Sequence, residues 1–331
     1  MSRVAVLAGG RSSEHEVSLA SGEAVRTGLV EAGHEVLDVR IGRSGEWTYG
    51  SEEVELRPGR GLLDADAVFP VLHGPFGEDG TLQGLLECLG VPYVGAGVLA
   101  SALCMDKVLA KEVLARRGIP QVEYLGIRAP DWRADTEGVL ARVAGLGLPS
   151  WVKPARLGSS VGIAKVTAEE EAGSALEAAF AHDDLVIVEA SAFGGSAVEV
   201  ECSLLGDEVP EVTPPGEIVL TRDWYDYEAK YTPGGMELRV PARISAAAAA
   251  KIPGIATAAW VATGCHGLAR ADFFVAEDRV LLNELNTMPG QTATSVYGAL
   301  WSHAGVPYRE VLDRLVGLGL RRHERQRSLA Y

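Results

Sequence analysis

The sequence predicts a mixed α/β (α+β) protein that begins with a parallel sheet. Three observations support this prediction. In the first third of the chain, short apolar runs alternate with amphipathic segments, the pattern of a parallel sheet covered by helices. From Val198 onward, strand-like runs dominate. The chain has 331 residues, 47% of them hydrophobic and 23% charged, which is enough for two or three domains with buried cores.

The first third supplies the parallel sheet. Its apolar spacing predicts strands at Val4–Leu7, Val36–Ile41 and Val68–Leu72, with helices at Val17–Glu31 and Thr81–Leu89. Ligands of such sheets bind at the carboxyl ends of the strands. Because the loops Gly9–Glu16 and His73–Gly80 follow two of these strands, we expect a binding site between them.

The rest of the chain adds helices and further strands. A helix is expected over Ser101–Arg117, and another within Arg128–Gly147. Two strands within Leu148–Glu189 should flank a glycine loop and a helix. Later helices are expected at Ser245–Thr263 and Val306–Leu318. The charged end Arg321–Arg327 is expected to be solvated and frayed.

Composition narrows the possible partners and the compartment. The net charge of -15 repels phosphate backbones and anionic lipids, which argues against nucleic acid and membrane surfaces. The four cysteines form no C-x-x-C pair, so neither a zinc site nor a disulfide framework is indicated. The apolar run Val4–Leu7 is too short for a signal peptide, and no run reaches the ~20 residues that span a bilayer. A cytoplasmic location is expected.

The segment Gly267–Asn286 places charged side chains inside two strands that are apolar on their other face. Strand side chains alternate between the two faces. One face of the first strand should therefore carry Arg270, Asp272 and Phe274, and one face of the second strand Val280, Leu282, Glu284 and Asn286. Buried charges need a partner or a metal. Oxygen ligands alone favour Mg²⁺ or Mn²⁺ over zinc. An internal ion pair from Arg270 to Asp272 or Glu284 is the alternative.

Two further patterns indicate nucleotide binding. Lys153 ends an apolar strand and is followed by the glycine-containing loop Ala155–Gly162, where backbone amides could approach an anion. The lysine precedes the glycines, so this is no P-loop, and an ordinary surface loop is equally compatible. Glu189, at a strand end, and Glu199 could accept from an adenine amino group or a ribose hydroxyl, although such carboxylates are more often solvated.

Three polar segments remain. The run Trp224–Tyr231 (W-Y-D-Y-E-A-K-Y) sets a lysine among aromatics, where its charge would act strongly on a phosphate; a surface hairpin is the alternative. His73 could be a general base or a capping residue. Met288–Ser295 offers hydroxyls and backbone amides to a carboxylate, although a plain polar turn would have the same composition.

Six stretches in the same order give the chain a resemblance to a known family. The chain resembles the D-alanine:D-alanine ligases of the ATP-grasp superfamily over essentially its full length. The matching stretches are Gly9–Ser18 (G-G-R-S-S-E-H-E-V-S), His73–Leu86, Val94–Lys107 ending in C-M-D-K, Val152–Gly162 (V-K-P-A-R-L-G-S-S-V-G), Tyr225–Tyr231 and Leu268–Gly290.

The resemblance implies an ATP-grasp fold and a ligase activity. It implies an N-terminal domain over 1–100 for the first substrate, and two domains over 101–188 and 189–331 that clamp ATP. The implied reaction joins two D-alanines through an acyl phosphate to give D-alanyl-D-alanine for peptidoglycan. The implied cofactors are ATP and two Mg²⁺ (or Mn²⁺), with a monovalent cation as a further candidate. A homodimer is expected.

The resemblance also carries residue roles for the nucleotide and the metals. Lys107 and Lys153 would hold ATP phosphates, and Lys230 would meet the transferring γ-phosphate. Glu189 and Ala192 would contact the adenine, and Glu199 the ribose. The remaining nucleotide contacts would be Ser159, Ser160, Asn283 and Glu284. The metal ligands would be Asp272, Glu284 and Asn286.

Further roles concern the two D-alanines. Glu14 would receive the ammonium of the first D-alanine, and Arg270 would stabilise the tetrahedral intermediate. The other substrate contacts would be Val17, His73, Gly290 and Ser295, while Ser159 and Tyr231 would link to Glu14 and close a loop over the site.

Departures from the family pattern leave alternatives open. The stretch Glu189–Glu199 is longer than the family spacing, and the residues after Ser295 lack an arginine-bearing pattern. A D-lactate or D-serine second substrate is one alternative, and Tyr231 argues against the lactate type. A non-catalytic nucleotide-binding protein is another. A dinucleotide-dependent dehydrogenase is disfavoured because Ala8–Ser13 lacks G-x-G-x-x-G.

Overall fold

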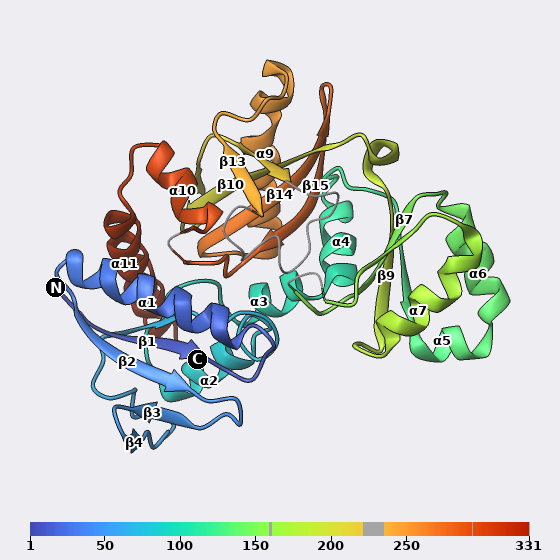
Figure 1. Cartoon of the computed structure of the whole chain (residues 1–331). Coiled ribbons are helices and arrows are strands. Elements are labelled where there is room, and N and C mark those ends of the chain that lie inside the picture. Colours follow the sequence, from blue (N-terminus) through green and yellow to red (C-terminus); the bar gives the residue numbers. More distant parts are fainter. Residues whose placement is uncertain (159–160, 221–234, 293, 331) are drawn as a thin grey trace.

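The computed structural model describes residues 1–158, 161–220, 235–292 and 294–330. Within these residues the strands form three sheets, and helices cover them (Figure 1). The mixed α/β architecture predicted from the sequence is confirmed. The N-terminal sheet is drawn in blue, the four-stranded sheet in green and yellow, and the third sheet largely in orange.

The N-terminal sheet has the strand order β4-β3-β2-β1-β5. Its strands are β1 (Arg3–Gly9), β2 (Glu35–Ile41), β3 (Trp47–Tyr49), β4 (Glu52–Glu53) and β5 (Ala67–Pro70). β1 pairs in parallel with both β2 and β5, as predicted. The helices α1 (His15–Glu31) and α2 (Thr81–Leu89) follow β1 and β5, respectively. The short antiparallel strands β3 and β4 were not expected.

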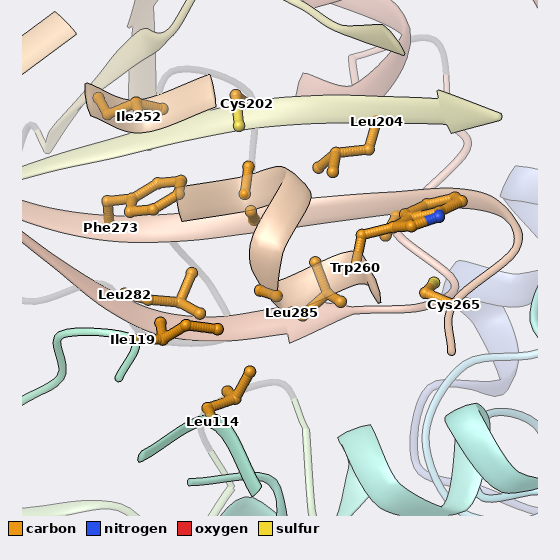
Figure 2. Close-up of a cluster of buried hydrophobic side chains, with 14 of the residues drawn as sticks. Leu114, Ile119, Cys202, Leu204, Ile252, Trp260, Cys265, Phe273, Leu282 and Leu285 are labelled. Carbon is orange, nitrogen blue, oxygen red and sulfur yellow. The ribbon is translucent and has the colours of Figure 1, made fainter. Parts of the chain in front are cut away.

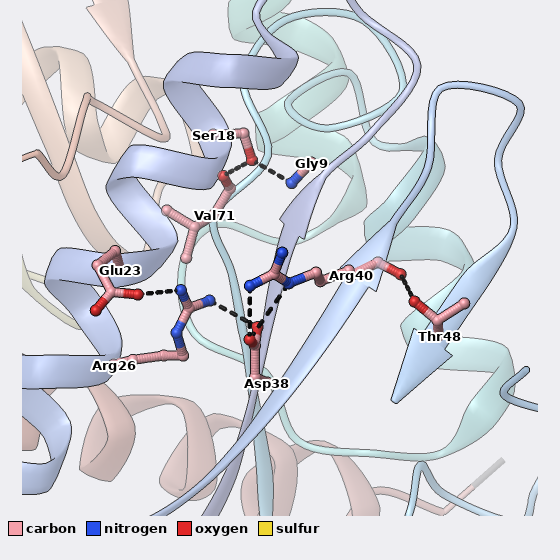
Figure 3. A network of polar contacts seen from close by, with 8 residues as sticks. All are labelled: Gly9, Ser18, Glu23, Arg26, Asp38, Arg40, Thr48 and Val71. Carbon is pink, nitrogen blue, oxygen red and sulfur yellow. Dashed lines mark hydrogen bonds and ion pairs between the residues drawn. The ribbon is translucent and has the colours of Figure 1, made fainter. Parts of the chain in front are cut away.

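Polar contacts hold α1 against the carboxyl end of this sheet (Figure 3). The Ser18 hydroxyl accepts from the Gly9 amide at 2.8 Å and donates to the Val71 carbonyl. Farther along α1, Arg26 donates to Asp38 of β2 at 2.6 Å. Because Ser18 ties the ends of two strands to one helix, the loops that leave those strands start from fixed positions.

The four-stranded sheet has the order β6-β9-β7-β8 and antiparallel pairing. Its strands are β6 (Tyr124–Arg128), β7 (Ser150–Pro154), β8 (Ala164–Val166) and β9 (Leu185–Ala190). Its helices are α5 (Ala129–Ala134), α6 (Thr136–Gly145), the 3-10 helix η1 (Glu169–Glu171) and α7 (Ala172–Phe180). The expected strands β7 and β9 are present, whereas β8 was missed and two helices occupy 128–147 where one was predicted.

The third sheet has the order β13-β12-β10-β14-β15, and β11 pairs with β10. Its elements are η2 (Ala192–Gly195), β10 (Val198–Gly206), β11 (Pro210–Val212), β12 (Gly216–Leu220), β13 (Met236–Arg239), α9 (Ala246–Thr263), β14 (Gly267–Ala276) and β15 (Arg279–Asn286). Figure 2 shows the core between this sheet and α9, in which Trp260, Phe273 and Leu282 are at most 1% exposed.

A register shift in this sheet corrects the predicted face of β15. Asp272 pairs with Glu284, but the next residue, Phe273, pairs with Leu282, so Asn283 is an extra residue in β15. Such a bulge reverses the side-chain parity beyond it. Leu282 therefore faces the core, together with Val280, and does not share a face with Glu284.

The helix predicted over Ser101–Arg117 is divided in the structure. It forms α3 (Val98–Met105) and α4 (Lys107–Arg116), separated by Asp106 in an extended conformation with ψ 98°. Asp106 Oδ1 accepts from the amides of Val108 and Leu109 at 3.1 and 3.0 Å. An aspartate in this position is a favourable N-cap, which explains why a new helix starts here.

The C-terminal tail is ordered farther than predicted. After α10 (Val296–His303), α11 (Tyr308–Arg327) runs through the charged segment that was expected to be frayed. Arg322 is only 6% exposed; its guanidinium donates to the carbonyls of Tyr93 and Gly95 and lies 4.0 Å from the Tyr93 ring centroid. Within the described residues, no helix has the combined length and apolarity needed to cross a bilayer.

Candidate active site

A cavity of about 520 Å³ is lined by residues of the second and third sheets and by the loops that follow β1 and β5 of the N-terminal sheet. It brings together side chains that are far apart in the sequence. The predicted site residues that line it are Glu14, His73, Lys107, Lys153, Glu189, Ala192, Glu199, Arg270, Asn283, Glu284, Asn286, Gly290 and Ser295. The binding site expected between the loops after β1 and β5 is thus part of a larger cavity.

Two predicted residues are not part of the cavity lining. Val17 is 7% exposed on α1, and Asp272 lies on β14 beside Arg270. Four others, Ser159, Ser160, Lys230 and Tyr231, lie outside the described residues.

At one end of the cavity, two lysines form ion pairs with the same carboxylate. Lys153 Nζ lies 2.5 Å from Glu189 Oε2, and Lys111 Nζ lies 2.8 Å from Glu189 Oε1. Burial disfavours the ionised carboxyl, but the two ammonium groups outweigh it and lower the pKa of Glu189 to about 2. Burial also opposes the charge of Lys153, but Glu189 and more distant carboxylates hold the Lys153 pKa above its usual value. Glu189 and Lys153 are therefore both charged at neutral pH.

Lys107 reaches the same end of the cavity from α4. Its Nζ donates to the Leu157 carbonyl at 2.7 Å and lies 3.8 Å from Glu284 Oε2. The Asp106 cap sets the first turn of this helix, and Lys107 is its first residue. Two ammonium groups, Lys107 and Lys153, thus face a space that also borders Gly158 of the glycine loop, an arrangement suited to a polyanion.

The guanidinium of Arg270 also lines the cavity. Its Nε and Nη2 each donate to Asp272 at 2.7 Å, and its Nε lies 2.9 Å from Glu201 Oε2. The internal ion pair considered from the sequence is therefore present. Glu201, which is 4% exposed, was missed because Glu199, Glu201 and Ser203 alternate with apolar residues, a pattern typical of a strand with one solvated face.

Oxygen donors lie on the two strands next to this arginine. Asp272 and Glu284 are cross-strand partners, and Asn286 is two residues beyond Glu284. In the part of the chain that the structure describes, no group of three His, Cys, Asp or Glu side chains could hold a metal ion. The donor set of two carboxylates and one amide still fits Mg²⁺, which prefers few protein oxygens and keeps water and phosphate ligands.

The loops after β1 and β5 form the N-terminal end of the cavity. Ser12 donates to the His73 carbonyl at 2.7 Å and accepts from the Glu14 amide at 3.2 Å, which fastens one loop to the other. Gly74 has φ +73°, and a Cβ there would lie 2.4 Å from Glu14 Oε2. Glycine is therefore required for the loop to pass so close to the Glu14 carboxylate.

Glu78 is a second carboxyl at this end, and the sequence reasoning did not single it out. It lines the cavity, and its Oε1 accepts from the Gly74 amide at 2.6 Å. Burial and the nearby charge of Glu14 raise the pKa of Glu78 to about 8. Glu78 therefore carries its proton at neutral pH.

His73 connects this end to the chain segment after β15. The side chain is 4% exposed; Nδ1 lies 3.3 Å from the Met288 carbonyl and Nε2 lies 3.0 Å from the Ser21 hydroxyl. Because a carbonyl oxygen only accepts hydrogen bonds, the contact with Met288 puts the ring proton of His73 on Nδ1. Burial lowers the pKa of His73 despite the opposing charge of Glu14, so the ring is neutral at pH 7.

The segment after β15 is held from several sides. Gln291 is 1% exposed. Its backbone N–H donates to the Ser21 hydroxyl at 3.3 Å, and its side-chain oxygen accepts from the Tyr308 hydroxyl at 2.9 Å. Ser295 Oγ accepts from the Thr292 amide at 2.9 Å. These contacts leave the Gly290–Ser295 turn at the cavity wall, where hydroxyls and amides can meet a carboxylate.

Comparisons with known proteins agree with this geometry. Family models described as D-ala D-ala ligase C-terminus and D-ala D-ala ligase N-terminus match residues 113–317 and residues 3–61 and 55–96. A D-alanine–D-alanine ligase of Deinococcus radiodurans is 46% identical, over 96% of this chain and 98% of the relative. Another from Geobacillus thermodenitrificans is 41% identical, over 99% of this chain and 98% of the relative.

Solved structures give the same result. The D-alanine-D-alanine ligase from Coxiella burnetii superposes with a TM-score of 0.85 at 34% identity, covering 98% of this chain and 97% of that one. The VanG D-Ala:D-Ser ligase from Enterococcus faecalis superposes with a TM-score of 0.84 at 35% identity, covering 96% of this chain and 99% of that one. The fold is the ATP-grasp fold of these enzymes, and the chain belongs to the D-alanine–D-alanine ligase family.

Proposed function

We propose that this enzyme joins two D-alanines to D-alanyl-D-alanine, with conversion of ATP to ADP and phosphate, as a step of peptidoglycan precursor synthesis. The observation that supports this most is the single cavity, which Glu14, Arg270, Lys107 and Lys153 all line. It offers an ammonium site, an oxyanion partner and a polyphosphate site in one cavity. Because the reaction consumes ATP, we place the enzyme in the cytoplasm.

The reaction balances in two steps. A carboxylate oxygen of the first D-alanine attacks the γ-phosphorus, ADP leaves, and an acyl phosphate forms. The amine of the second D-alanine then attacks the acyl carbon, the C–O bond to phosphate breaks, and the amine loses a proton. Glu14 holds the ammonium of the first D-alanine, with Val17 behind it, and Arg270 stabilises the oxyanion of the tetrahedral intermediate.

The nucleotide occupies the lysine end of the cavity in this proposal. Lys107 and Lys153 bind phosphate oxygens, with Lys230, Ser159 and Ser160 completing that set. The adenine lies at the end of β9 near Glu189 and Ala192, the ribose at Glu199, and Asn283 and Glu284 border the phosphates. Asp272, Glu284 and Asn286 would hold two Mg²⁺ or Mn²⁺, which neutralise charge on the transferring phosphoryl group.

The second D-alanine lies between His73 and the Gly290–Ser295 turn. Amides and hydroxyls of that turn bind its carboxylate, and neutral His73 keeps the turn against the N-terminal loops. Ser159 and Tyr231 link to Glu14 and close the site, which keeps water from the acyl phosphate. The domain limits 1–100, 101–188 and 189–331, the homodimer and a monovalent cation stay predictions from the family resemblance.

The test is phosphate release from ATP and Mg²⁺, with the product identified by mass spectrometry. D-alanine alone should support release and give the dipeptide, and L-alanine should not. Mixtures with D-serine and D-lactate measure selectivity, which matters because one of the similar structures is a D-Ala:D-Ser ligase. Release only with a mixed pair would change the product, and no release with any amino acid would refute the proposed function.

A further inference from the structure

A third lysine lies beneath the nucleotide end of the cavity, and the proposed mechanism leaves it without a role. Lys111 is one helical turn after Lys107 on α4 and is 3% exposed. Residues four apart on a helix share a face, so both lysines point to the same side. Lys107 reaches the cavity, whereas Lys111 ends at Glu189, which it shares with Lys153.

The contact of Lys111 with Glu189 is a buried ion pair. The distance from Lys111 Nζ to Glu189 Oε1 is 2.8 Å. The Tyr124 ring is a further neighbour, with its centroid 5.7 Å from Nζ. Both charges of the pair are nearly inaccessible, with side chains 3% and 4% exposed. Lys111 therefore acts on Glu189 through its charge.

The charges around this pair explain why a third lysine matters. A small pocket of about 20 Å³ adjoins the main cavity, and the charged side chains that line it are Lys107, Lys111, Lys153, Glu189 and Glu284. Three cations against two carboxylates leave a surplus of one positive charge. Without Lys111 the surplus is zero, since Lys153 pairs with Glu189 and Lys107 lies near Glu284.

We propose that Lys111 is a positioning residue that keeps Glu189 neutralised when Lys153 turns from this carboxylate to a nucleotide phosphate. If Lys153 left Glu189 without a second cation present, a buried carboxylate would lose its partner, which is costly. With Lys111 in place, Lys153 can exchange one anion for another. This role rests on the proposed function, because it assumes that the cavity takes a nucleotide.

The direct test is the affinity for ADP, measured by calorimetry without any amino acid. Lys111→Met should weaken ADP binding about tenfold or more, since it leaves Lys153 as the only counter-ion of Glu189. Lys111→Arg keeps the charge and should bind within about threefold of wild type. In turnover, the KM for ATP should rise in Lys111→Met while kcat and the KM for D-alanine change much less. Lys251→Met removes an exposed charge outside the cavity and is the matched control.

A double-mutant cycle separates this role from a general structural one. In a Glu189→Gln background no carboxylate competes for Lys153, so adding Lys111→Met should change ADP affinity by less than about threefold. In that double variant Lys111 and Glu189 lose their charges together, so neither is left as an unpaired charge, and it also serves if Lys111→Met alone does not fold.

Three results would overturn the inference. They are unchanged ADP affinity in Lys111→Met, equal losses in Lys111→Met and Lys111→Arg, and the same loss in the Glu189→Gln background as in wild type. A wild-type protein that binds no ADP would instead refute the proposed function itself.

Discussion

Replacement of Asp106 by alanine tests how the chain places its phosphate-binding lysines. Asp106 separates α3 from α4, and its Oδ1 accepts from two amides, Val108 at 3.1 Å and Leu109 at 3.0 Å. It is 8% exposed, so water cannot easily replace the lost acceptor. Lys107 follows immediately, and its position depends on where the helix starts.

The magnitude follows from the contacts that alanine would remove. Loss of an N-cap acceptor costs roughly 0.5–2 kcal/mol, and the buried setting with two donors argues for the upper end of that range. Loss of a negative charge at the helix N-terminus adds about 0.3–1 kcal/mol. Asp106→Ala should therefore lower the free energy of unfolding by about 2 kcal/mol. Asp106→Asn keeps the acceptor and should lose only the smaller charge contribution.

Urea unfolding followed by circular dichroism measures the stability of both variants, and calorimetry measures their ADP affinity. We expect Asp106→Ala to lose both stability and ADP affinity, because the first turn of α4 carries Lys107. Asp106→Asn should stay close to wild type in both. Equal destabilisation by alanine and asparagine, or full ADP affinity in a destabilised Asp106→Ala, would refute the reasoning.

Three further predictions follow from other parts of the molecule. Arg322→Ala should lower the free energy of unfolding by about 2–4 kcal/mol, because the buried carbonyls of Tyr93 and Gly95 lose their donor. Thermal unfolding measures this loss, and a value under about 0.5 kcal/mol would contradict the prediction. Folding raises the pKa of Glu78 from 4.5 to about 8, so between these values the carboxyl is ionised in the unfolded chain but protonated in the folded protein. Wild-type stability therefore falls as pH rises through that range. Glu78→Gln should therefore gain stability relative to wild type from pH 5 to pH 9 in chemical unfolding, and a difference that does not depend on pH would exclude this origin. Arg270→Lys loses the bidentate contact with Asp272. It should reduce kcat by about 100-fold or more, while ADP affinity stays within about threefold of wild type. A variant with normal kcat would remove Arg270 from the mechanism.

Local patterns in the sequence were sufficient for the elements that build the cavity walls. The strands β1 and β5 and the pair β14–β15 are apolar runs bounded by glycine or turn residues, so their positions could be predicted. The loop around His73 and the strand-end residues Lys153 and Glu189 could be singled out because polar groups directly follow buried strands.

What could not be predicted depends on contacts between distant parts of the chain. The bulge at Asn283 inserts one residue against β14, and an alternating pattern does not show where parity changes. Arg322 belongs to a charged run that reads as solvated, until the fold brings the Tyr93 and Gly95 carbonyls to it. Lys111 reads as an ordinary helix lysine, and its burial follows only from the position of Glu189.

The central claim is that this cavity carries one D-alanine carboxylate through phosphoryl transfer to a second D-alanine. The most direct measurement uses D-alanine labelled with oxygen-18 in both carboxylate oxygens, together with unlabelled ATP and Mg²⁺. An acyl phosphate requires that the released phosphate carries one labelled oxygen and that the dipeptide retains label in its peptide carbonyl. Phosphate free of oxygen-18 alongside normal dipeptide formation would contradict the account.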